Sequence, residues 1–346
     1  MTFSKDDERY MRRALQLAVN GRGHVSPNPM VGAVIVAPDG RVIGEGWHRR
    51  FGGPHAEVNA VRAVAEPDRA LLPLSTIYVT LEPCSHYGKT PPCAGMLVDQ
   101  GIGRVVVAAG DPNPKVSGRG IGILRDAGIE VEEGLLAGEA EALNRTFMTS
   151  QRLRRPFVTL KWARSADGFM DHVRAVGEGA ARFSTPLSSQ LVHRRRAEHD
   201  AIAVGAGTVL ADNPRLDTRL IAGESPRPVI FDRQKLLAGR RAAVFAPGRR
   251  AIHITEDRPL AETLHSLFAD EGISSLLVEG GLSLLGEFIA SGLWDEAYEE
   301  VSPMLLGARG RAVAPRIGES PVCTTAINDN LVNFYSHTPS GGVKNI

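Results

Sequence analysis

A strand, a turn and a helix start follow one another in residues 76–93, which read TIYVTLEPCSHYGKTPPC. The segment 76–81 is largely apolar without a polar alternation, which is typical of a strand in a sheet covered by helices on both faces. Similar apolar runs occupy 30–37 and 104–109, and segments with helical periodicity lie between them. This alternation predicts an α/β fold for the first half of the chain.

The chain has 346 residues, which is enough for two domains at about 100–200 residues each. A helical stretch near 138–149 leads into the basic segment 151–155, which Pro156 closes. We place the boundary there, so that residues 1–150 form one domain and residues 151–346 the other. A second series of apolar runs predicts another α/β domain, with expected strands at 157–160, 201–204, 228–231, 251–254 and 275–278.

The composition argues against several classes of protein. Lys and Arg number 40 and Asp and Glu 39, so the net charge of +1 argues against broad binding to nucleic acids or membrane surfaces. No apolar run approaches the ~18 residues that a membrane span needs, and no secretory signal is visible at the start. The 3 cysteines are too few for a disulfide framework, which favours metal or catalytic use in a reducing compartment. We therefore expect a cytoplasmic protein.

One histidine and two cysteines in the first half suit a zinc site. His55 opens a helical pattern, Cys84 follows the apolar run 76–81, and Cys93 starts another helix-like run. One imidazole and two thiolates form a three-ligand set that leaves the fourth tetrahedral position of Zn²⁺ to water, whose pKa the ion lowers towards ~7. The alternative is a core histidine with two unpaired core cysteines, which fits this ordered pattern less well. Cys323 has no such neighbours, and we expect it to be a small buried residue.

Glu57 follows His55 by two residues, about 200° around an ideal helix. The two side chains converge only if the metal lies beyond the N-terminal tip of that helix, towards which side chains lean. Glu57 would then take a proton from the zinc-bound water and deliver it to a leaving amine. Zinc deaminases have a His-x-Glu followed by Pro-Cys-x-x-Cys, in which the glutamate is not a ligand. This chain has eight residues between the cysteines, so it matches that pattern only in part.

The long spacer of 83–93 closely resembles that of the bifunctional riboflavin-biosynthesis deaminase/reductases. The segments PNPMVG at 27–32, GWH at 46–48, GPHAE at 53–57 and DPNP at 111–114 match the same family in order. The resemblance implies a cytidine-deaminase-like three-layer α/β/α domain followed by a dihydrofolate-reductase-like α/β domain. It also implies that 2,5-diamino-6-ribosylamino-4(3H)-pyrimidinone 5′-phosphate is deaminated, and that NADPH then reduces the ribosyl side chain to give 5-amino-6-(5-phosphoribitylamino)uracil.

The resemblance also assigns site residues in the first half. It makes Glu57 the catalytic proton carrier and His55, Cys84 and Cys93 the ligands of Zn²⁺. Contacts to the pyrimidine or its phosphate are implied for Asn28, His48, His86 and Lys89. This is chemically reasonable, because a fixed amide can distinguish donors from acceptors on the ring and a cation can hold phosphate. The alternatives are that Asn28 is a turn residue between prolines and that His86 and Lys89 are solvated loop residues.

In the second half, the resemblance places Ala163, Thr208, Asp212 and the turn 281–287, which begins at Gly281, against NADPH. Glycines at a strand-to-helix turn let backbone amides approach a cofactor phosphate. Arg233, just after an expected strand, is a candidate for the 2′-phosphate, although spacing alone does not choose NADPH over NADH. Contacts to the substrate are implied for Arg196, Leu216, Arg219 and Glu279. Surface ion pairing is the alternative for the two arginines.

The segment 177–186, GEGAARFSTP, departs from the family pattern. The family commonly has Gly-Glu-Ser and a Trp two residues on; both the serine and the tryptophan are missing here. Phe183 could replace the ring, and Ser184 or Thr185 the hydroxyl. This departure motivates an alternative in which only the deaminase is active and the reductase domain is degenerate. Two further alternatives are a nucleic-acid base deaminase and a purely structural zinc site. The resemblance also suggests a homo-oligomer with a small-molecule substrate.

Overall fold

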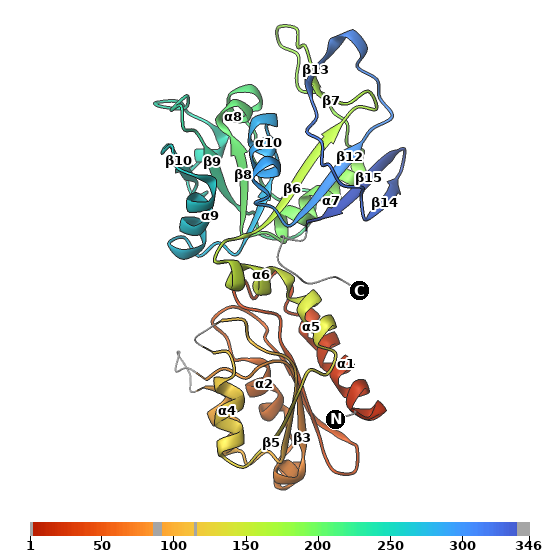
Figure 1. Ribbon diagram of the computed structural model, residues 1–346, viewed down its shortest axis with the longest axis vertical. Helices are drawn as coiled ribbons and strands as arrows, with labels where there is room; N and C mark the ends of the chain where they lie inside the picture. Colours follow the sequence, from red (N-terminus) through yellow and green to blue (C-terminus); the bar gives the residue numbers. More distant parts are fainter. Residues whose placement is uncertain (1–2, 86–91, 114–115, 338–346) are drawn as a thin grey trace. The chain divides into compact units, whose positions relative to one another are not determined.

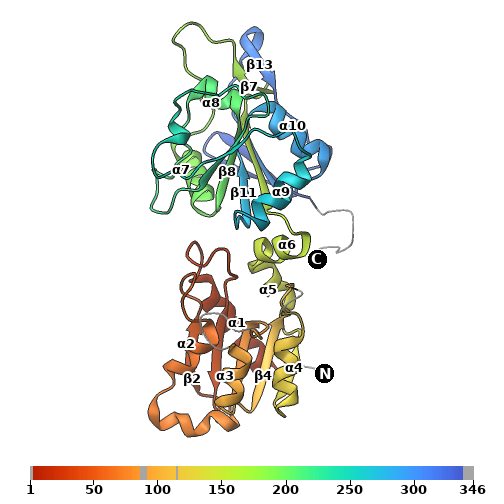
Figure 2. The same cartoon turned by 90° about the vertical axis from the view of Figure 1, so that its left-hand side faces the viewer.

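The computed structural model describes residues 3–85, 92–113 and 116–337. The chain divides into two compact units, Met1–Arg154 and Arg155–Ile346, each with its own sheet and hydrophobic core (Figures 1 and 2). No helix among these residues is both long enough and apolar enough to cross a membrane.

The first unit is built on a five-stranded sheet with the strand order β2-β1-β3-β4-β5. β1 pairs antiparallel with β2 and β3, whereas β3, β4 and β5 are parallel. The expected strand 76–81 is confirmed as β3, and 104–109 as β4. The strands are β1 Gly32–Val36, β2 Val42–Trp47, β3 Thr76–Leu81, β4 Arg104–Ala109 and β5 Glu130–Glu133.

Helices cover both faces of this sheet, which gives three layers. One core cluster joins the sheet to α2, α3 and α4, and the other joins it to α1, α5 and α6. The helices are α1 Lys5–Val19, α2 Ala56–Ala63, α3 Cys93–Asp99, α4 Arg119–Asp126, α5 Ala137–Leu143 and α6 Arg145–Leu153, and a 3-10 helix spans Glu66–Leu74. Because the central strands β1, β3 and β4 are buried on both faces, their apolar runs are nearly continuous, as the sequence indicated.

A buried carboxylate ties α1 to the sheet. Asp7 closes a capping box with Ser4, the N-cap of α1. It also accepts hydrogen bonds from the Tyr78 hydroxyl at 2.7 Å and from Arg104 at 2.9 Å, on β3 and β4. Burial raises the pKa of Asp7, but the bonds from Arg104, Ser4 and Tyr78 outweigh it and hold that pKa well below its usual range.

The helical stretch expected near 138–149 is two helices. α5 ends at Leu143 and α6 begins at Arg145, and Asn144 between them has φ −105° and ψ 22°, outside helical geometry. Its side chain caps neither helix but forms two hydrogen bonds with the backbone of Met30.

The second unit is built on an eight-stranded sheet with the order β10-β9-β8-β11-β6-β12-β15-β14. The strands from β10 to β12 run parallel, and β15 and β14 complete the sheet antiparallel. The strands are β6 Phe157–Arg164, β8 Ala201–Gly205, β9 Arg227–Phe231, β10 Ile252–Ile254, β11 Ser275–Val278, β12 Glu296–Val301, β14 Cys323–Ile327 and β15 Asn330–Ser336. The carboxyl ends of the parallel strands meet at one edge, where ligands of open α/β sheets bind.

The remaining elements of this unit connect and cover the sheet. β7 Phe169–His172 pairs with β13 Gly310–Val313 in a separate two-stranded sheet. The helices are α7 Pro186–Ala197, α8 Ala206–Asp212, α9 Leu260–Ala269 and α10 Leu282–Ser291, with short 3-10 helices at Ala243–Phe245 and Gly307–Arg309.

The expectation that Cys323 is buried was wrong. Cys323 is exposed on β14, the edge strand of the eight-stranded sheet. The next three residues of β14 are exposed as well, because no further element covers this end of the hairpin within the described part of the chain.

Candidate active sites

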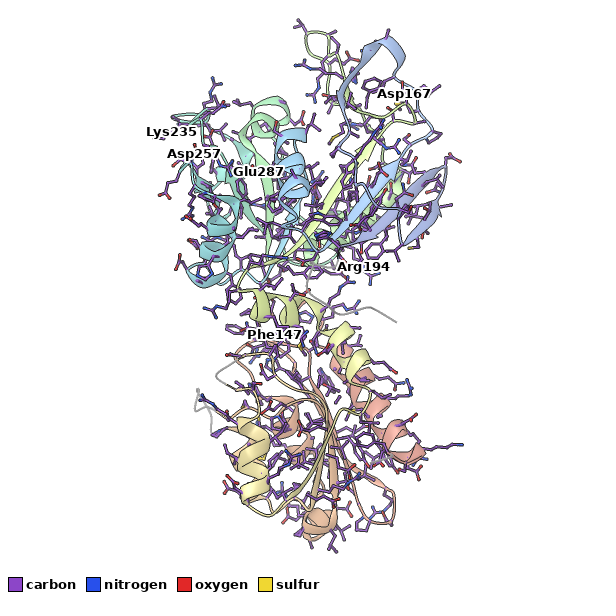
Figure 3. The ribbon with its side chains drawn as sticks, in the orientation of Figure 1. Phe147, Asp167, Arg194, Lys235, Asp257 and Glu287 are labelled. Carbon is purple, nitrogen blue, oxygen red and sulfur yellow. The ribbon has the colours of Figure 1, made fainter. Side chains whose placement is uncertain are left out.

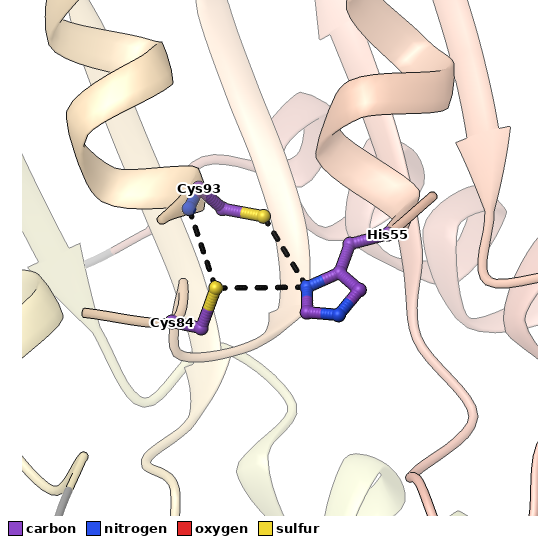
Figure 4. Close-up of side chains that lie close together, drawn as sticks. All are labelled: His55, Cys84 and Cys93. Atoms are coloured by element: carbon purple, nitrogen blue, oxygen red, sulfur yellow. Dashed lines mark hydrogen bonds between the residues drawn. The ribbon is translucent and has the colours of Figure 1, made fainter. Parts of the chain in front are cut away.

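Three potential metal ligands of the first unit converge on one point (Figure 4). His55 is the N-cap residue of α2, Cys84 follows the end of β3, and Cys93 is the first residue of α3. The Nδ1 atom of His55 lies 3.6 Å from the Sγ atom of Cys84 and 3.4 Å from the Sγ atom of Cys93. The three ligand atoms all lie within 4.8 Å of one another.

These separations fit a tetrahedral zinc ion. With Zn–S bonds of about 2.3 Å and Zn–N bonds of about 2.0–2.1 Å, tetrahedral angles place a nitrogen and a sulfur ligand ~3.6 Å apart. No fourth His, Cys, Asp or Glu joins the group within residues 3–85, 92–113 and 116–337. Structural zinc sites normally have four protein ligands, so a three-ligand set favours a catalytic site with an open position.

The two sulfurs are coupled through hydrogen bonds. The backbone amide of Cys93, at the start of α3, donates to the Cys84 Sγ at 3.3 Å. The side chain of Cys93 and then that of His55 lower the pKa of the Cys84 thiol to about 4, against the effect of its burial. The same contact with Cys84 raises the pKa of Cys93, so without a cation the pair shares one proton. A divalent cation binds two thiolates and displaces that proton.

Glu57 lies in the first turn of α2 with 3% of its surface exposed. Its carboxylate accepts a hydrogen bond from the Cys93 side chain, which puts it at the edge of the ligand cluster. Burial raises the pKa of Glu57, although the charge of His55 opposes this shift. A carboxyl group in these surroundings can hold a proton at a pH where an exposed glutamate is ionised.

Asn28 and His48 form a hydrogen-bonded pair beside this cluster. The Nδ1 atom of His48 lies 3.1 Å from the carbonyl oxygen of Pro54, so Nδ1 carries a proton and donates it. Burial lowers the pKa of His48, which favours a neutral ring whose Nε2 accepts from the Asn28 Nδ2 at 3.2 Å. The Nδ2 atom of Asn28 is then used on His48, which leaves its Oδ1 atom as an acceptor that a ligand can use. The His48 ring lies edge-on to His55 with centroids 5.3 Å apart.

His86 and Lys89, which the resemblance also assigns to the substrate, lie outside the described residues.

Glu82 is a buried residue that sequence reasoning missed. Its carboxylate accepts hydrogen bonds from the backbone amides of Asp111, Gly118 and Gly120 at 3.3, 3.0 and 3.0 Å. It thereby links the end of β3, two residues before Cys84, to the loop that leads into α4. An acidic residue between a strand and Pro-Cys is the only sequence signal for this role.

In the second unit, two expected substrate residues form a buried ion pair. The Nε and Nη2 atoms of Arg196 donate to the two carboxylate oxygens of Glu279 at 2.8 and 2.5 Å. Burial raises the pKa of Glu279, but Arg196 more than compensates and lowers it. Lys161 on β6, which sequence reasoning missed, faces Glu279 and Glu300, and burial lowers its pKa. A lone lysine in an otherwise apolar strand was the available signal.

Leu216 and Arg219, the other expected substrate residues, lie on a loop surrounded by arginines. Leu216 is buried with φ 51°, and the Nη2 atom of Arg249 donates to its carbonyl at 2.8 Å. Arg215 and Arg219 both pair with Asp217 on the same loop, and Arg196 donates to the Asp217 carbonyl at 3.0 Å. Sequence reasoning missed Arg215 and Arg249. Four guanidinium groups around one loop suit a phosphate group.

Two expected cofactor residues meet where α8 and α10 begin. The Thr208 hydroxyl accepts a hydrogen bond from the backbone amide of Gly281 at 3.0 Å. A Cβ atom on Gly281 would lie 3.1 Å from that hydroxyl, so the close approach favours glycine. Asp212, at the end of α8, accepts a hydrogen bond from Arg174 at 2.6 Å, and Ala163 lies on β6.

A cavity of about 250 Å³ opens beside this turn, at the carboxyl ends of β8 and β9. Arg233 lies in its wall, and its Nη2 atom donates to Glu287 of α10 at 2.7 Å. Asp257 lies 3.9 Å from the same guanidinium group; Figure 3 labels Asp257 and Glu287 on this unit. Of the five expected cofactor residues, Arg233 is the one in the lining, which comprises Gly205, Ala206, Gly207, Phe231, Asp232, Arg233, Gln234, Leu236, Ser283, Leu284 and Glu287.

The unusual segment 177–186 contributes a hydroxyl to the charged cluster, which comprises Lys161, Arg196, Glu279 and Glu300. Ser184 donates to Glu300 at 2.5 Å, next to Lys161. Thr185 is instead the N-cap of α7, and Phe183 is buried, with its carbonyl bonded to Asn330. Ser184 is therefore the residue of this segment whose hydroxyl lies beside the charged cluster.

Two family models match the chain, one in each unit. The cytidine and deoxycytidylate deaminase zinc-binding region matches residues 4–109, and the RibD C-terminal domain matches residues 156–327. Riboflavin biosynthesis protein RibD of Bacillus amyloliquefaciens is 40% identical over 327 residues, which cover 87% of this chain and 85% of that protein. The chain belongs to the RibD family. The Escherichia coli RibD is 38% identical over 344 residues, which cover 89% of this chain and 91% of that protein.

Solved RibD structures have the same fold. A RibD structure from Acinetobacter baumannii matches with a TM-score of 0.85 at 35% identity, covering 96% of this chain and 99% of that one. A deaminase/reductase structure from Thermotoga maritima matches with a TM-score of 0.83 at 36% identity and the same coverage. The expected fold class, a cytidine-deaminase-like domain followed by an α/β reductase domain, is confirmed.

As a member of the RibD family, the protein is a bifunctional enzyme of riboflavin biosynthesis, a hydrolase that deaminates and an oxidoreductase. Its cofactors are zinc in the deaminase domain and NADPH in the reductase domain. Both domains are present, and nothing favours the alternative of a deaminase with a degenerate reductase.

Proposed function

We propose that this RibD protein deaminates 2,5-diamino-6-ribosylamino-4(3H)-pyrimidinone 5′-phosphate and then reduces the ribosyl group of the product to ribityl. The Thermotoga maritima structure is described as a diaminohydroxyphosphoribosylaminopyrimidine deaminase and 5-amino-6-(5-phosphoribosylamino)uracil reductase, which supports this substrate. The observation that carries the proposal is the convergence of His55, Cys84 and Cys93 beside the buried carboxyl of Glu57.

In the deaminase site, we assign His55, Cys84 and Cys93 as the residues that hold zinc. The ion, when bound, supplies an acidified water as the nucleophile. Glu57 takes the proton that the nucleophile loses and gives it to the departing amine, a role that its raised pKa supports. Asn28, held by His48, orients the pyrimidine by accepting a hydrogen bond from the ring edge.

In the reductase site, we assign the loop that carries Leu216 and Arg219 to the ribose phosphate, together with Arg196. Glu279 and Lys161 lie next to it and can hold a proton beside the ribosyl group. NADPH, when bound, supplies the hydride. The N-terminus of α10, which follows Gly281, suits a cofactor phosphate, and Arg233 suits the 2′-phosphate.

Glu57→Gln tests the deaminase assignment. The purified variant should retain about one zinc per chain, because glutamine keeps the shape and Glu57 is not a ligand. Deamination should fall by ~10²-fold or more, since an amide cannot carry the proton. Metal analysis and separate assays of the two half-reactions measure both effects, with the reductase as internal control. Turnover near that of the unchanged protein would remove Glu57 from the mechanism.

We also propose that the protein works in the cytoplasm as a homo-oligomer with no nucleic-acid partner. The net charge of +1 and the resemblance to the RibD family support this. Light scattering coupled to size-exclusion chromatography tests the oligomer, and a monomeric mass at working concentration would contradict it. Fractionation of the producing cells tests the location, and oligonucleotide titration at low salt tests whether the protein binds nucleic acid.

A further inference from the structure

Asn144 bonds to both polar groups of one peptide far away in the sequence. Its Oδ1 atom accepts from the backbone amide of Met30 at 2.8 Å, and its Nδ2 atom donates to the carbonyl of Met30 at 2.9 Å. The two residues are 114 positions apart, and Asn144 is 3% exposed. This arrangement fixes the backbone of Met30 in the way a neighbouring strand would.

The clamped peptide lies two residues from Asn28. Pro27 and Pro29 flank Asn28 and have no amide hydrogen to donate. The amide of Asn28 donates to Val25 at 2.8 Å, and the next backbone amide along the chain is that of Met30. The segment 27–30 belongs to no strand or helix, so Asn144 supplies the hydrogen bonds that a sheet neighbour supplies to β1.

The Asn28 side chain also has a demanding position. Its Nδ2 atom must stay 3.2 Å from the His48 Nε2, while His48 is itself bonded to Pro54, the residue before His55. A shift of the 27–30 backbone would therefore move the Oδ1 atom of Asn28 relative to the metal ligands. Misplacement of about 1 Å in a binding group is enough to cost up to ~10²-fold in rate.

The conformation of Asn144 is consistent with a dedicated role. It lies between α5 and α6 with non-helical torsion angles, and its side chain makes no capping hydrogen bond to either helix. Asn is commonly found at helix starts because it caps the backbone, but here both amide atoms are used on Met30.

We infer that Asn144 is a positioning residue for pyrimidine recognition: it holds the 27–30 segment so that Asn28 presents its Oδ1 atom to the substrate of the deaminase. The inference rests on the proposed role of Asn28 and adds a residue that contacts neither substrate nor metal. The chemistry recognised is a hydrogen-bond donor on the edge of an aminopyrimidine.

Two variants of Asn144 test this in the full-length, zinc-loaded protein. Asn144→Ala removes both bonds, whereas Asn144→Asp keeps the shape and the bond to the Met30 amide but loses the donor to the carbonyl. We expect the deamination KM to rise about tenfold for Asn144→Ala and at least as much for Asn144→Asp, because the aspartate places a carboxylate oxygen against the Met30 carbonyl, with a far smaller change in kcat. Zinc content and NADPH-dependent reduction should stay unchanged. Glu139→Ala is the matched control: it changes an exposed residue of α5 and removes its pair with Arg12 of α1, and it should leave KM unaltered.

A double-mutant cycle with Asn28→Ala separates positioning from a general structural role. If Asn144 acts through Asn28, adding Asn144→Ala to Asn28→Ala should change kcat/KM for deamination by less than about twofold. Additive losses would overturn the inference while leaving the role of Asn28 intact. Loss of zinc in both Asn144 variants, or an unchanged KM in both, would also overturn it. If Asn28→Ala itself had no effect on KM, the proposed role of Asn28 would fail, and the positioning role with it.

Discussion

The metal-ligand cluster of the deaminase unit and the charged cluster of the reductase unit differ in how their side chains are satisfied. His55, Cys84 and Cys93 have one another as partners and share protons among three potential metal ligands. In the reductase unit, opposite charges are already matched, as in Arg196 with Glu279 and Arg233 with Glu287. The first cluster therefore needs a cation to become complete, whereas the charges of the second are matched without one. On the proposed assignment, Arg196 and Arg233 exchange partners when their ligands bind.

The largest effect is expected from a change in the metal-ligand cluster. Cys84→Ser should abolish zinc binding and lower deamination by at least ~10²-fold, because two ligands cannot hold the ion. NADPH oxidation by the same protein, supplied with the deaminated substrate, should persist, since the charged cluster lies in the other unit. Metal analysis and the two half-reactions measure the outcome. Loss of both activities together would break the contrast between the sites.

The matched charges of the reductase unit predict a loss of stability when one partner is removed. Arg196→Leu leaves Glu279 buried without its partner and should destabilise the unit by about 3–5 kcal/mol. Trp162 and Trp294, both buried in this unit, report unfolding in denaturant. The neighbouring Arg194→Leu, at a residue labelled in Figure 3, removes only an exposed pair with Glu198 and should cost about 0.5 kcal/mol or less. Equal costs for the two variants would contradict the matched-charge description.

Partner exchange at Arg233 predicts a change in cofactor preference. Arg233→Ser should raise the KM for NADPH about tenfold and leave that for NADH nearly unchanged, because only NADPH has a 2′-phosphate. Glu287→Gln should lower the KM for NADPH, since it removes the carboxylate that competes for Arg233. Initial rates with both cofactors check this. A parallel change for NADPH and NADH would exclude a contact with the 2′-phosphate.

A smaller effect is expected from pH. Burial lowers the pKa of His199, whose ring contacts the Arg195 carbonyl and Thr159. The unfolded chain then binds a proton more readily than the folded one. The contribution of the neutral His199 to the free energy of unfolding is therefore complete above pH ~6.5 and is lost as the pH falls below that value. The free energy of unfolding of the unit should decline by at most about 1.4 kcal/mol per pH unit. His199→Gln should flatten the profile; an identical slope in the variant would exclude His199 as its cause.

The same contrast explains how much of the molecule could be predicted. His55, Cys84, Cys93 and Glu57 belong to short motifs at the ends of secondary-structure elements, so the sequence alone singled out residues that the structure brings together. The strands β3, β4 and β11 were likewise predicted residue for residue, because their continuous apolar runs have clear ends. In these places, local chemistry and local structure coincide.

The rest depends on contacts that no local pattern encodes. Asn144 interrupts a helical pattern for the sake of a peptide 114 residues away. Arg249 is one of many arginines until the fold brings it to Leu216. Cys323 was expected to be buried because cysteine usually is, and only the strand order shows that it lies at an open edge. The roles of individual site residues and the functional boundary near residue 150 stay predictions.

The exposed edge strand that carries Cys323 has a practical consequence. Zinc loading protects Cys84 and Cys93 from alkylation, since both sulfurs would be ligands, whereas the Cys323 thiol faces solvent. A maleimide dye should therefore attach to the metal-loaded protein at a single position on the reductase unit. Chelation would then leave Cys84 as a partly exposed thiol of low pKa, so that labelling beyond one dye per chain reports the loss of the metal.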